Sequence, residues 1–164
     1  AAAEKLAPVT GIIIAAGPGF VKDDFLSYLK RKAPDIASRV MTAETRRTGY
    51  GAVQEAIGNG VLARAAEDIQ LAREVSFMDE LFLRIGKGGA AAYGIDEVQR
   101  AVDFGAAESI LISDTMLREG RFAKLLEEAE QMNADAVVLS TEFEPGKRLE
   151  GLGGIAALLR FPIV

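Results

Sequence analysis

The chain has 164 residues, 49% of them hydrophobic, and a formal net charge of −5. This length allows one ordinary domain or two small ones, with a core large enough to fold without disulfides. The sequence contains no cysteine, no histidine and no tryptophan, which excludes disulfides, thiol or imidazole catalysis and the usual zinc sites. An enzyme built from these residues would have to use carboxylates, lysines or a hard cation held by carboxylates.

The negative charge is unevenly distributed along the chain. Residues 1–86 carry equal numbers of basic and acidic side chains, whereas residues 87–164 hold the whole negative excess. We therefore expect the two halves to meet different partners. No run approaches the roughly 20 apolar residues that cross a membrane, and the first residues lack the pattern of a secretory signal. These features predict a cytoplasmic protein without membrane attachment.

The first half predicts a strand, a helix and a second strand. The apolar, β-branched run at residues 11–16 is typical of a short strand that is buried on both faces. From Phe20 the apolar spacing becomes helical and ends before Pro34, and residues 39–43 predict the second strand. Such a βαβ unit requires parallel strands. Two strands make a sheet too small to be buried on both faces by the predicted helices. We therefore expect that the chain begins inside a domain or that another molecule covers the faces of this sheet.

Two further helices are predicted before the middle of the chain. Residues 53–57 indicate a short helix, which stops at the Gly-Asn-Gly sequence of residues 58–60. Apolar residues then recur every three or four positions, which predicts a helix of about 20 residues and roughly 30 Å. We place a domain boundary at the glycine-rich loop after it. The predicted domains are residues 1–86, including a connector helix at about 67–85, and residues 87–164.

The second half alternates helices with short apolar strands. Helical spacing predicts helices at 95–104, 122–129 and 147–152, and apolar runs predict strands at 110–112, 136–139 and 155–159. Helices that alternate with buried strands indicate a compact three-layer α/β/α domain.

The turn between the first strand and the first helix is a candidate site. Residues 17–22, Gly-Pro-Gly-Phe-Val-Lys, lie where backbone N–H groups can hold a phosphate. Their spacing matches neither a phosphate loop nor the dinucleotide fingerprint, and Asp23 and Asp24 would repel an anion. We interpret the motif as a tight turn with a capped helix. Phe20 on such a turn is a candidate protein anchor, and small-molecule binding stays open as an alternative.

Basic residues and one aspartate complete the candidates. Arg46 and Arg47 lie in a polar loop and not at the end of a predicted helix, so no helix dipole accounts for them. They are therefore candidates for contact with RNA or a protein. The cations at residues 30–32 end a helix, whose dipole stabilises them whatever else they bind. Asp114 ends a strand, where α/β sheets often bind ligands and where capping is common. No carboxylates have the spacing of a metal site, so no metal ligand and no catalytic residue is predicted.

Several of these segments resemble one known family. They are the C-terminal string GGIAALLRFP at residues 153–162, Tyr93-Gly94, Glu97-Val98, Leu111–Asp114, Leu117-Arg118, Gly146, and Gly17-Pro18-Gly19-Phe20 with Lys22. Together they resemble the C-terminal part of archaeal Pelota proteins, which are relatives of class I release factors. The likeness covers essentially the whole chain. It implies a truncated ribonuclease H-like central domain, the βαβ part, and a C-terminal domain similar to kink-turn-binding ribosomal proteins.

The resemblance implies a factor of ribosome rescue and mRNA surveillance, or no-go decay. Members of this family enter stalled ribosomes with a GTPase of the elongation factor 1-alpha type and assist an ABC-type recycling ATPase. The residues expected to meet the GTPase are Pro18, Gly19, Phe20 and Lys22, and those expected to approach the GTPase or RNA are Arg46 and Arg47. The Gly-Gly-Gln motif with which release factors hydrolyse peptidyl-tRNA does not occur here. This difference separates rescue from termination.

These features together predict a non-catalytic adaptor with no cofactor and no small-molecule substrate. The competing hypothesis is a divalent-metal-dependent endoribonuclease that acts on stalled mRNA. In the family this activity has been assigned to an Sm-like N-terminal domain that has no counterpart in this sequence. Within this chain the reaction would have to use Asp23, Asp24 or Asp114.

Overall fold

The structure is a computed structural model that describes residues 2–163. Its contacts divide the chain into two compact units, one that ends at Ile69 and one that begins at Gln70. The boundary expected near residue 86 falls later than this division. The difference arises because the second half of the long helix belongs to the second core, in which its residues Met78 and Leu81 are fully buried.

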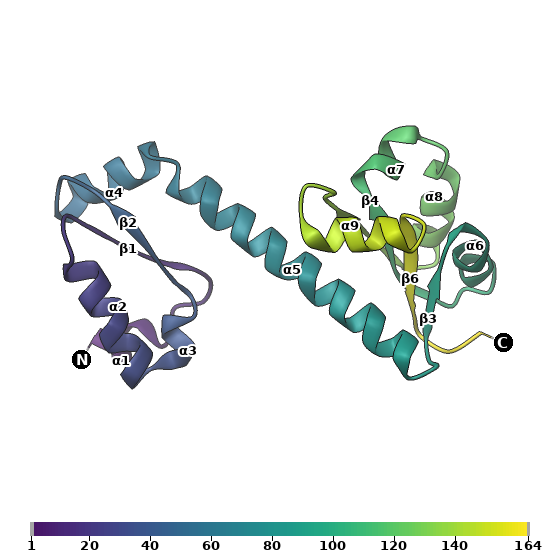
Figure 1. Ribbon diagram of the computed structural model, residues 1–164, viewed down its shortest axis with the longest axis horizontal. Helices are drawn as coiled ribbons and strands as arrows, with labels where there is room; N and C mark the ends of the chain where they lie inside the picture. The colour runs from purple at the N-terminus through teal and green to yellow at the C-terminus, as the bar shows by residue number, and fades with distance from the viewer. Residues whose placement is uncertain (1, 164) are drawn as a thin grey trace. The chain divides into compact units, whose positions relative to one another are not determined.

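The first unit contains one parallel pair of strands (Figure 1). Its strands are β1 (Ile13–Gly17) and β2 (Val40–Glu44), and its helices are α1 (Ala2–Leu6), α2 (Val21–Lys32), α3 (Pro34–Ala37), α4 (Gly49–Gly58) and the beginning of α5 (Val61–Gly86). The pairing is parallel, with Ile13 opposite Val40 and Gly17 opposite Glu44. The predicted βαβ unit is therefore confirmed.

The residues of β1 contribute to two small cores. Ile13 packs with Leu29 of α2 on one side, whereas Ile14 and Ala16 pack with Ala43 on the other. This alternation follows because successive side chains of a strand point to opposite faces. All five residues of β1 are only half-buried, so the prediction of a strand buried on both faces was wrong. A sheet of two strands is too narrow to be enclosed by its helices.

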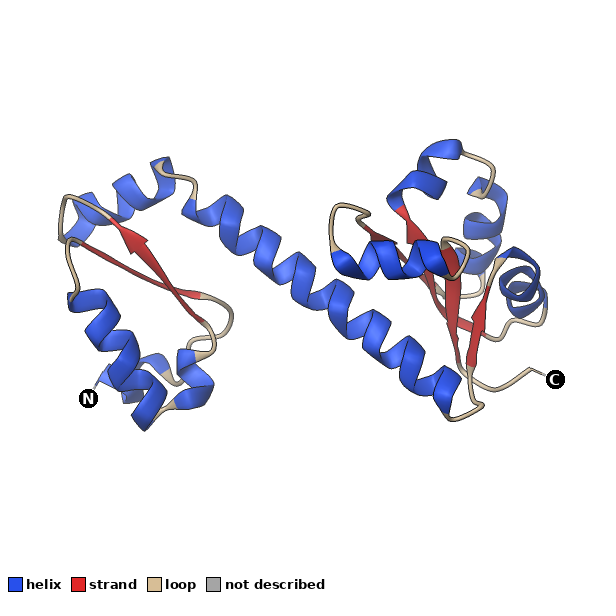
Figure 2. Ribbon diagram, viewed as in Figure 1, coloured by secondary structure: helices blue, strands red, loops and turns tan. Residues whose placement is uncertain are grey.

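The second unit contains a mixed four-stranded sheet in the order β3-β6-β4-β5. Its strands are β3 (Ala91–Tyr93), β4 (Ala107–Ser113), β5 (Asp135–Leu139) and β6 (Ile155–Leu159), and its helices besides the rest of α5 are α6 (Ile95–Asp103), α7 (Asp114–Glu119), α8 (Ala123–Gln131) and α9 (Glu144–Gly151). β4 runs parallel to β5 and antiparallel to β6, which is also antiparallel to β3 (Figure 2).

Helices cover both faces of this sheet. Ile110 of β4 lies in a core with Val98 of α6, whereas its neighbour Leu111 lies in the opposite core with Met78 of α5 and Leu149 of α9. Burying an aliphatic side chain of this size stabilises the folded state by about 1.5 to 3 kcal/mol. The alternating strand therefore binds helices to both of its faces, and the predicted three-layer α/β/α arrangement is confirmed.

The long helix α5 begins earlier than predicted. It starts at Val61 because residues 61–66, which include Leu, Arg and three Ala, are mostly good helix formers. Gly60, in the left-handed region at φ 78°, separates it from α4. Within residues 2–163, neither α5 nor any other helix combines the length and the apolar character that crossing a membrane requires.

Candidate partner-binding site

The two parallel strands of the first unit bring the candidate residues together. The turn of residues 17–22 follows β1, and the loop of residues 45–48 follows β2. Because parallel strands end at the same edge of a sheet, both segments lie at that edge. The Thr45 N–H donates to the Gly17 carbonyl at 3.4 Å. The structure thus places Pro18, Phe20 and their neighbours beside the Arg46-Arg47 loop.

Glu44, the last residue of β2, holds the turn in place. The Gly19 N–H donates to Glu44 Oε1 at 3.2 Å, and Gly19 has a φ of 66°, which favours glycine. The Lys22 ammonium donates to Glu44 Oε2 and to the Gly19 carbonyl, and the Lys22 side chain is only 8% exposed. Lys22 therefore stabilises the turn from within. Its expected contact with a partner stays a prediction.

The Glu44 contacts change the titration of its carboxyl group. The hydrogen bond from Lys22, and after it the hydrogen bond from the Gly19 N–H, lowers the pKa of Glu44 from the ordinary 4.5. A carboxyl group whose pKa is lower in the folded than in the unfolded state stabilises the fold above its unfolded pKa. This contribution is lost as the pH falls through the folded pKa.

Acid should therefore release the turn. We expect the Glu44 carboxyl carbon to titrate below pH 4.5 in an NMR experiment, and the Gly19 amide signal to move with the same midpoint. The variant Lys22→Met should shift the midpoint toward the ordinary value, because it removes the main hydrogen-bond donor. A Glu44 midpoint that is the same in both proteins would contradict this description of the turn.

Phe20 is displayed on this fixed turn. Its side chain is 82% exposed, and that of Val21 is 77% exposed. The Phe20 carbonyl accepts hydrogen bonds from the N–H groups of Asp23 and Asp24 at 3.0 and 2.9 Å, so the first turn of α2 fixes its backbone. An aromatic side chain on an ordered backbone loses little entropy on binding. The geometry suits a protein anchor.

The Arg46-Arg47 loop is also held by a carboxylate. Glu55 of α4 accepts the Arg46 N–H at 3.0 Å and the Arg47 N–H at 3.2 Å, and the Thr45 hydroxyl donates to the Arg47 carbonyl at 3.0 Å. Among residues 2–163, neither guanidinium group has a hydrogen-bond or ion-pair partner. Both cations are thus available on an ordered loop, beside a hollow of about 400 Å³ that Gly51 and Gln54 also line.

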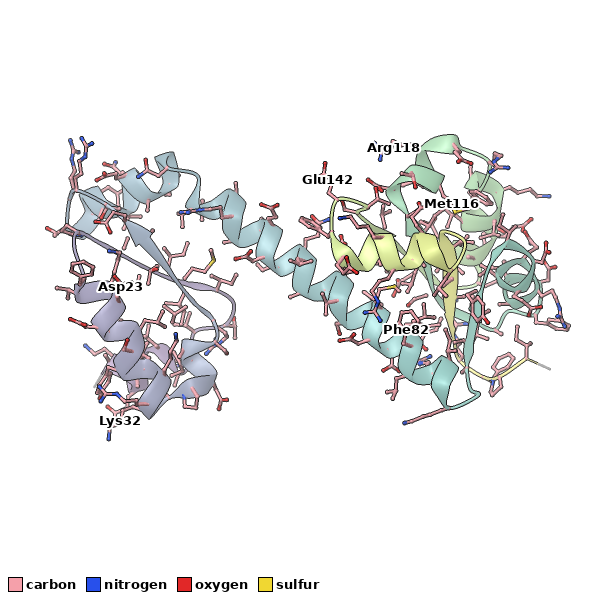
Figure 3. All side chains as sticks on the ribbon, viewed as in Figure 1. Asp23, Lys32, Phe82, Met116, Arg118 and Glu142 are labelled. Atoms are coloured by element: carbon pink, nitrogen blue, oxygen red, sulfur yellow. The ribbon has the colours of Figure 1, made fainter. Side chains whose placement is uncertain are left out.

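The aspartates of the nuclease hypothesis belong to different units. Asp23 and Asp24 lie in the first turn of α2, and Lys32 is its last residue (Figure 3). The basic residues 30–32 occupy its last turn, where the dipole stabilises them. Asp114 is the first residue of α7. The part of the chain that the structure describes contains no group of three or more carboxylates placed to hold a metal ion.

Asp114 connects α7 with the loop that follows β5. Its Oδ1 accepts from the Thr141 N–H at 3.0 Å and the Thr141 hydroxyl at 2.8 Å, and its Oδ2 accepts from Arg118 at 2.9 Å. Desolvation raises the pKa of Asp114, but these hydrogen bonds and the Arg118 charge outweigh it, so the pKa is lowered. Asp114 is therefore an ionised acceptor that joins two segments. The N-cap of α7 is the preceding residue, Ser113, whose hydroxyl oxygen accepts the Met116 N–H at 3.3 Å, so Asp114 does not cap this helix.

The structure also reveals residues that sequence reasoning missed. Glu44 and Glu55 position the turn and the loop, but isolated glutamates carry no signal of such a role. Val53 and Ile57 were counted with the apolar pattern of a short helix, yet they are 50% and 52% exposed. Ala56, the third residue of that predicted pattern, is the one that is buried, at 3% exposure.

Comparison with known proteins gives matches along the whole chain. The family model described as eRF1 domain 3 matches residues 71–163. The Protein pelota homolog of Methanocorpusculum labreanum is 65% identical over 158 residues, which cover 96% of this chain and 46% of that protein. The chain thus spans about half the length of the relatives that it matches.

Solved structures give the same result. Archaeoglobus fulgidus Pelota has a TM-score of 0.87 and 40% identity, over 99% of this chain and 52% of that one. Archaeal Pelota, in a model of its ribosome-bound form with ABCE1, has a TM-score of 0.65 and 37% identity, over 92% and 43%. Saccharomyces cerevisiae Dom34, a translation termination-like factor involved in RNA quality control pathways and interacting with Hbs1, has a TM-score of 0.61 and 25% identity, over 99% and 50%. This chain belongs to the archaeal Pelota family, and its second unit carries the eRF1 domain 3 of that family.

Proposed function

We propose that the chain is a non-catalytic adaptor in the rescue of stalled ribosomes and in no-go mRNA decay. Its first unit docks a GTPase of the elongation factor 1-alpha type, and it cooperates on the ribosome with an ABC-type recycling ATPase. The ribosome-bound archaeal Pelota with ABCE1 and the Dom34 that interacts with Hbs1 support partners of this kind.

One observation carries the docking role. A turn fixed by the Glu44 carboxylate leaves Phe20 82% exposed. Two arginines, whose guanidinium groups have no partner within the described residues 2–163, lie at the same end of the strand pair. An aromatic anchor beside exposed guanidinium groups is the composition of a protein-binding hot spot. Two carboxylates of this site, those of Glu44 and Glu55, accept hydrogen bonds from N–H groups of the site itself. The residues at this edge are therefore suited to binding a partner protein.

Replacing Phe20 by alanine should weaken binding of the GTPase about tenfold or more, because truncating a central anchor typically costs over 1 kcal/mol. Isothermal titration calorimetry against the purified GTPase in its GTP form measures this change. The far-UV circular dichroism spectrum should stay unchanged, since the side chain contributes to no core.

The matched control is Tyr28→Ala. Tyr28 is another exposed aromatic residue of α2, at 44%, and lies outside the turn. Equal affinities for the Phe20 and Tyr28 variants would contradict the docking role. Cleavage of a stem-loop RNA that requires added magnesium or manganese and is lost in Asp23→Asn, Asp24→Asn or Asp114→Asn would instead support the endoribonuclease hypothesis.

A further inference from the structure

The second unit contains a hollow of about 850 Å³ between α5 and the sheet. Its apolar lining comes mainly from Phe77 and the exposed Val75 and Leu83 of α5, and from Leu158 of β6. Every lining residue belongs to the second unit, which the family model matches almost throughout. The hollow therefore does not depend on the narrow sheet of the first unit. Its volume lies in the range of about 300 to 1,000 Å³ that is typical of small-molecule sites.

Ser109 of β4 brings a hydroxyl group to this hollow. Ser109 and Leu111 are two positions apart in the strand, so their side chains share the face on which Leu111 lies in one core with Met78 of α5. Ser109 is only 6% exposed, and among residues 2–163 its hydroxyl has no hydrogen-bond partner. The described part of the chain has no fully enclosed side-chain nitrogen or oxygen without a partner. The Ser109 oxygen is therefore open to the hollow that it lines, as a free hydrogen-bond donor.

Arg73 brings an unpaired positive charge to the same hollow. Its guanidinium group lies over the Phe77 ring, 5.5 Å from the ring centroid, and has no ion-pair partner within the described residues. Asp79 also lines the hollow. Six positions along an α-helix place it about 120° around the axis from Arg73, so the two charges do not face each other.

The other two carboxylates of the hollow are already engaged. Arg84 donates to Glu80 at 2.6 Å and to Glu108 at 3.0 Å. Arg84 is 11 positions from Arg73, which is about 16 Å along the helix. The hollow thus has a free cation beside an aromatic ring toward one end and an ion-paired cluster toward the other.

We propose that this hollow binds a small amphiphilic anion, with an aromatic or aliphatic body and one carboxylate or sulfonate group. The body packs on Phe77 and Leu158, the anionic group pairs with Arg73, and an oxygen of the ligand accepts the Ser109 hydroxyl. The carboxylates of the lining disfavour a ligand with several negative charges, such as a nucleotide or RNA. The inference is independent of the proposed function, because no residue of the first unit takes part.

The dye anilinonaphthalene sulfonate has this chemistry, since it joins an aromatic body to one sulfonate. Proton–nitrogen NMR of the whole chain locates its binding, and the amide signals of Arg73, Phe77 and Ser109 should move in a saturable manner. N-phenylnaphthylamine carries the same rings without the sulfonate and is the matched control ligand. It should bind about fivefold or more weakly, because it offers no acceptor to the Arg73 guanidinium.

Two variants test the polar contacts. Arg73→Met keeps the apolar stem and should weaken binding of the sulfonate about fivefold or more, while leaving N-phenylnaphthylamine unaffected. Ser109→Ala should weaken binding of the sulfonate about threefold. Arg64→Met, at an exposed position of α5 that does not line the hollow, is the matched control and should bind both ligands normally. NMR spectra of the free variants check that each is folded.

The contrary outcomes are equally specific. Signal changes confined to β1 and β2 would show that the dye binds the half-buried sheet of the first unit, and the proposal would be wrong. Equal affinities for the two ligands, or an affinity for the sulfonate that either variant leaves unchanged, would overturn the assigned contacts. If neither ligand gives saturable binding, the hollow holds only water and the proposal falls.

Discussion

The variant Gly146→Ala should unfold the second unit at much lower denaturant concentrations than the unaltered chain. A methyl group at Gly146 would lie 2.0 Å from the Ser140 carbonyl oxygen and 2.8 Å from the Thr141 nitrogen. These are backbone atoms of the loop between β5 and α9, so a change of side-chain rotamer cannot relieve the clash. Overpacking of this kind costs about 3 kcal/mol, which urea denaturation followed by circular dichroism measures.

Gly151→Ala is the matched control for this clash. Gly151 ends the same helix α9, and a methyl group there meets no atom within 4 Å. We expect its stability to lie within about 1 kcal/mol of the unaltered chain, with any change favourable, because alanine is the better helix former. A Gly146 variant as stable as the Gly151 variant would show that α9 does not pack this closely on the loop.

Removing the buried carboxylate of Glu74 should also destabilise the loop between β5 and α9, because this residue of α5 binds the loop backbone. Glu74 of α5 is only 2% exposed. It accepts the Ser140 N–H at 3.2 Å and the Gln70 side-chain amide at 2.9 Å. Glu74→Ala leaves the Ser140 N–H without its acceptor and opens a cavity, which together should cost about 2 to 3 kcal/mol.

Glu74→Gln separates the lost hydrogen bond from the lost charge. The glutamine carbonyl can still accept the Ser140 N–H, and the Gln70 amide can turn to accept from the new side chain. We expect this variant to keep most of the stability in the same urea experiment. Equal losses in the alanine and glutamine variants would show that the charge of Glu74, and not its contact with Ser140, stabilises the loop.

The sequence predicted those elements whose signal is local. The helix expected from Phe20 to before Pro34 is observed as α2, and the strand expected at residues 155–159 is observed as β6. By contrast, β3 has only three residues and is defined by its pairing with β6, more than 60 positions away along the chain. Local hydrophobic periodicity cannot predict a pairing between residues so far apart in the sequence. The six-residue helix α7 was missed for a related reason, since it is too short to show a period.

The candidate site was predictable in its residues and not in its arrangement. Phe20 and the two arginines could be named from the chemistry of turns and loops. Their common edge depends on the parallel register of β1 and β2, and the βαβ pattern gave only the direction of these strands. The contact between Lys22 and Glu44 joins the ends of two different strands. Because of this contact, Lys22 stabilises the turn from within, whereas the sequence predicted a cation that faces a partner.

Titration of the unaltered chain with an elongation factor 1-alpha type GTPase, loaded with a non-hydrolysable GTP analogue, tests the adaptor role most directly. Calorimetry should give saturable binding of one GTPase to one chain, and the affinity should fall as salt rises, because exposed arginines contribute. If no heat of binding appears while the same preparation cleaves stem-loop RNA in magnesium, the chain is a nuclease and not an adaptor.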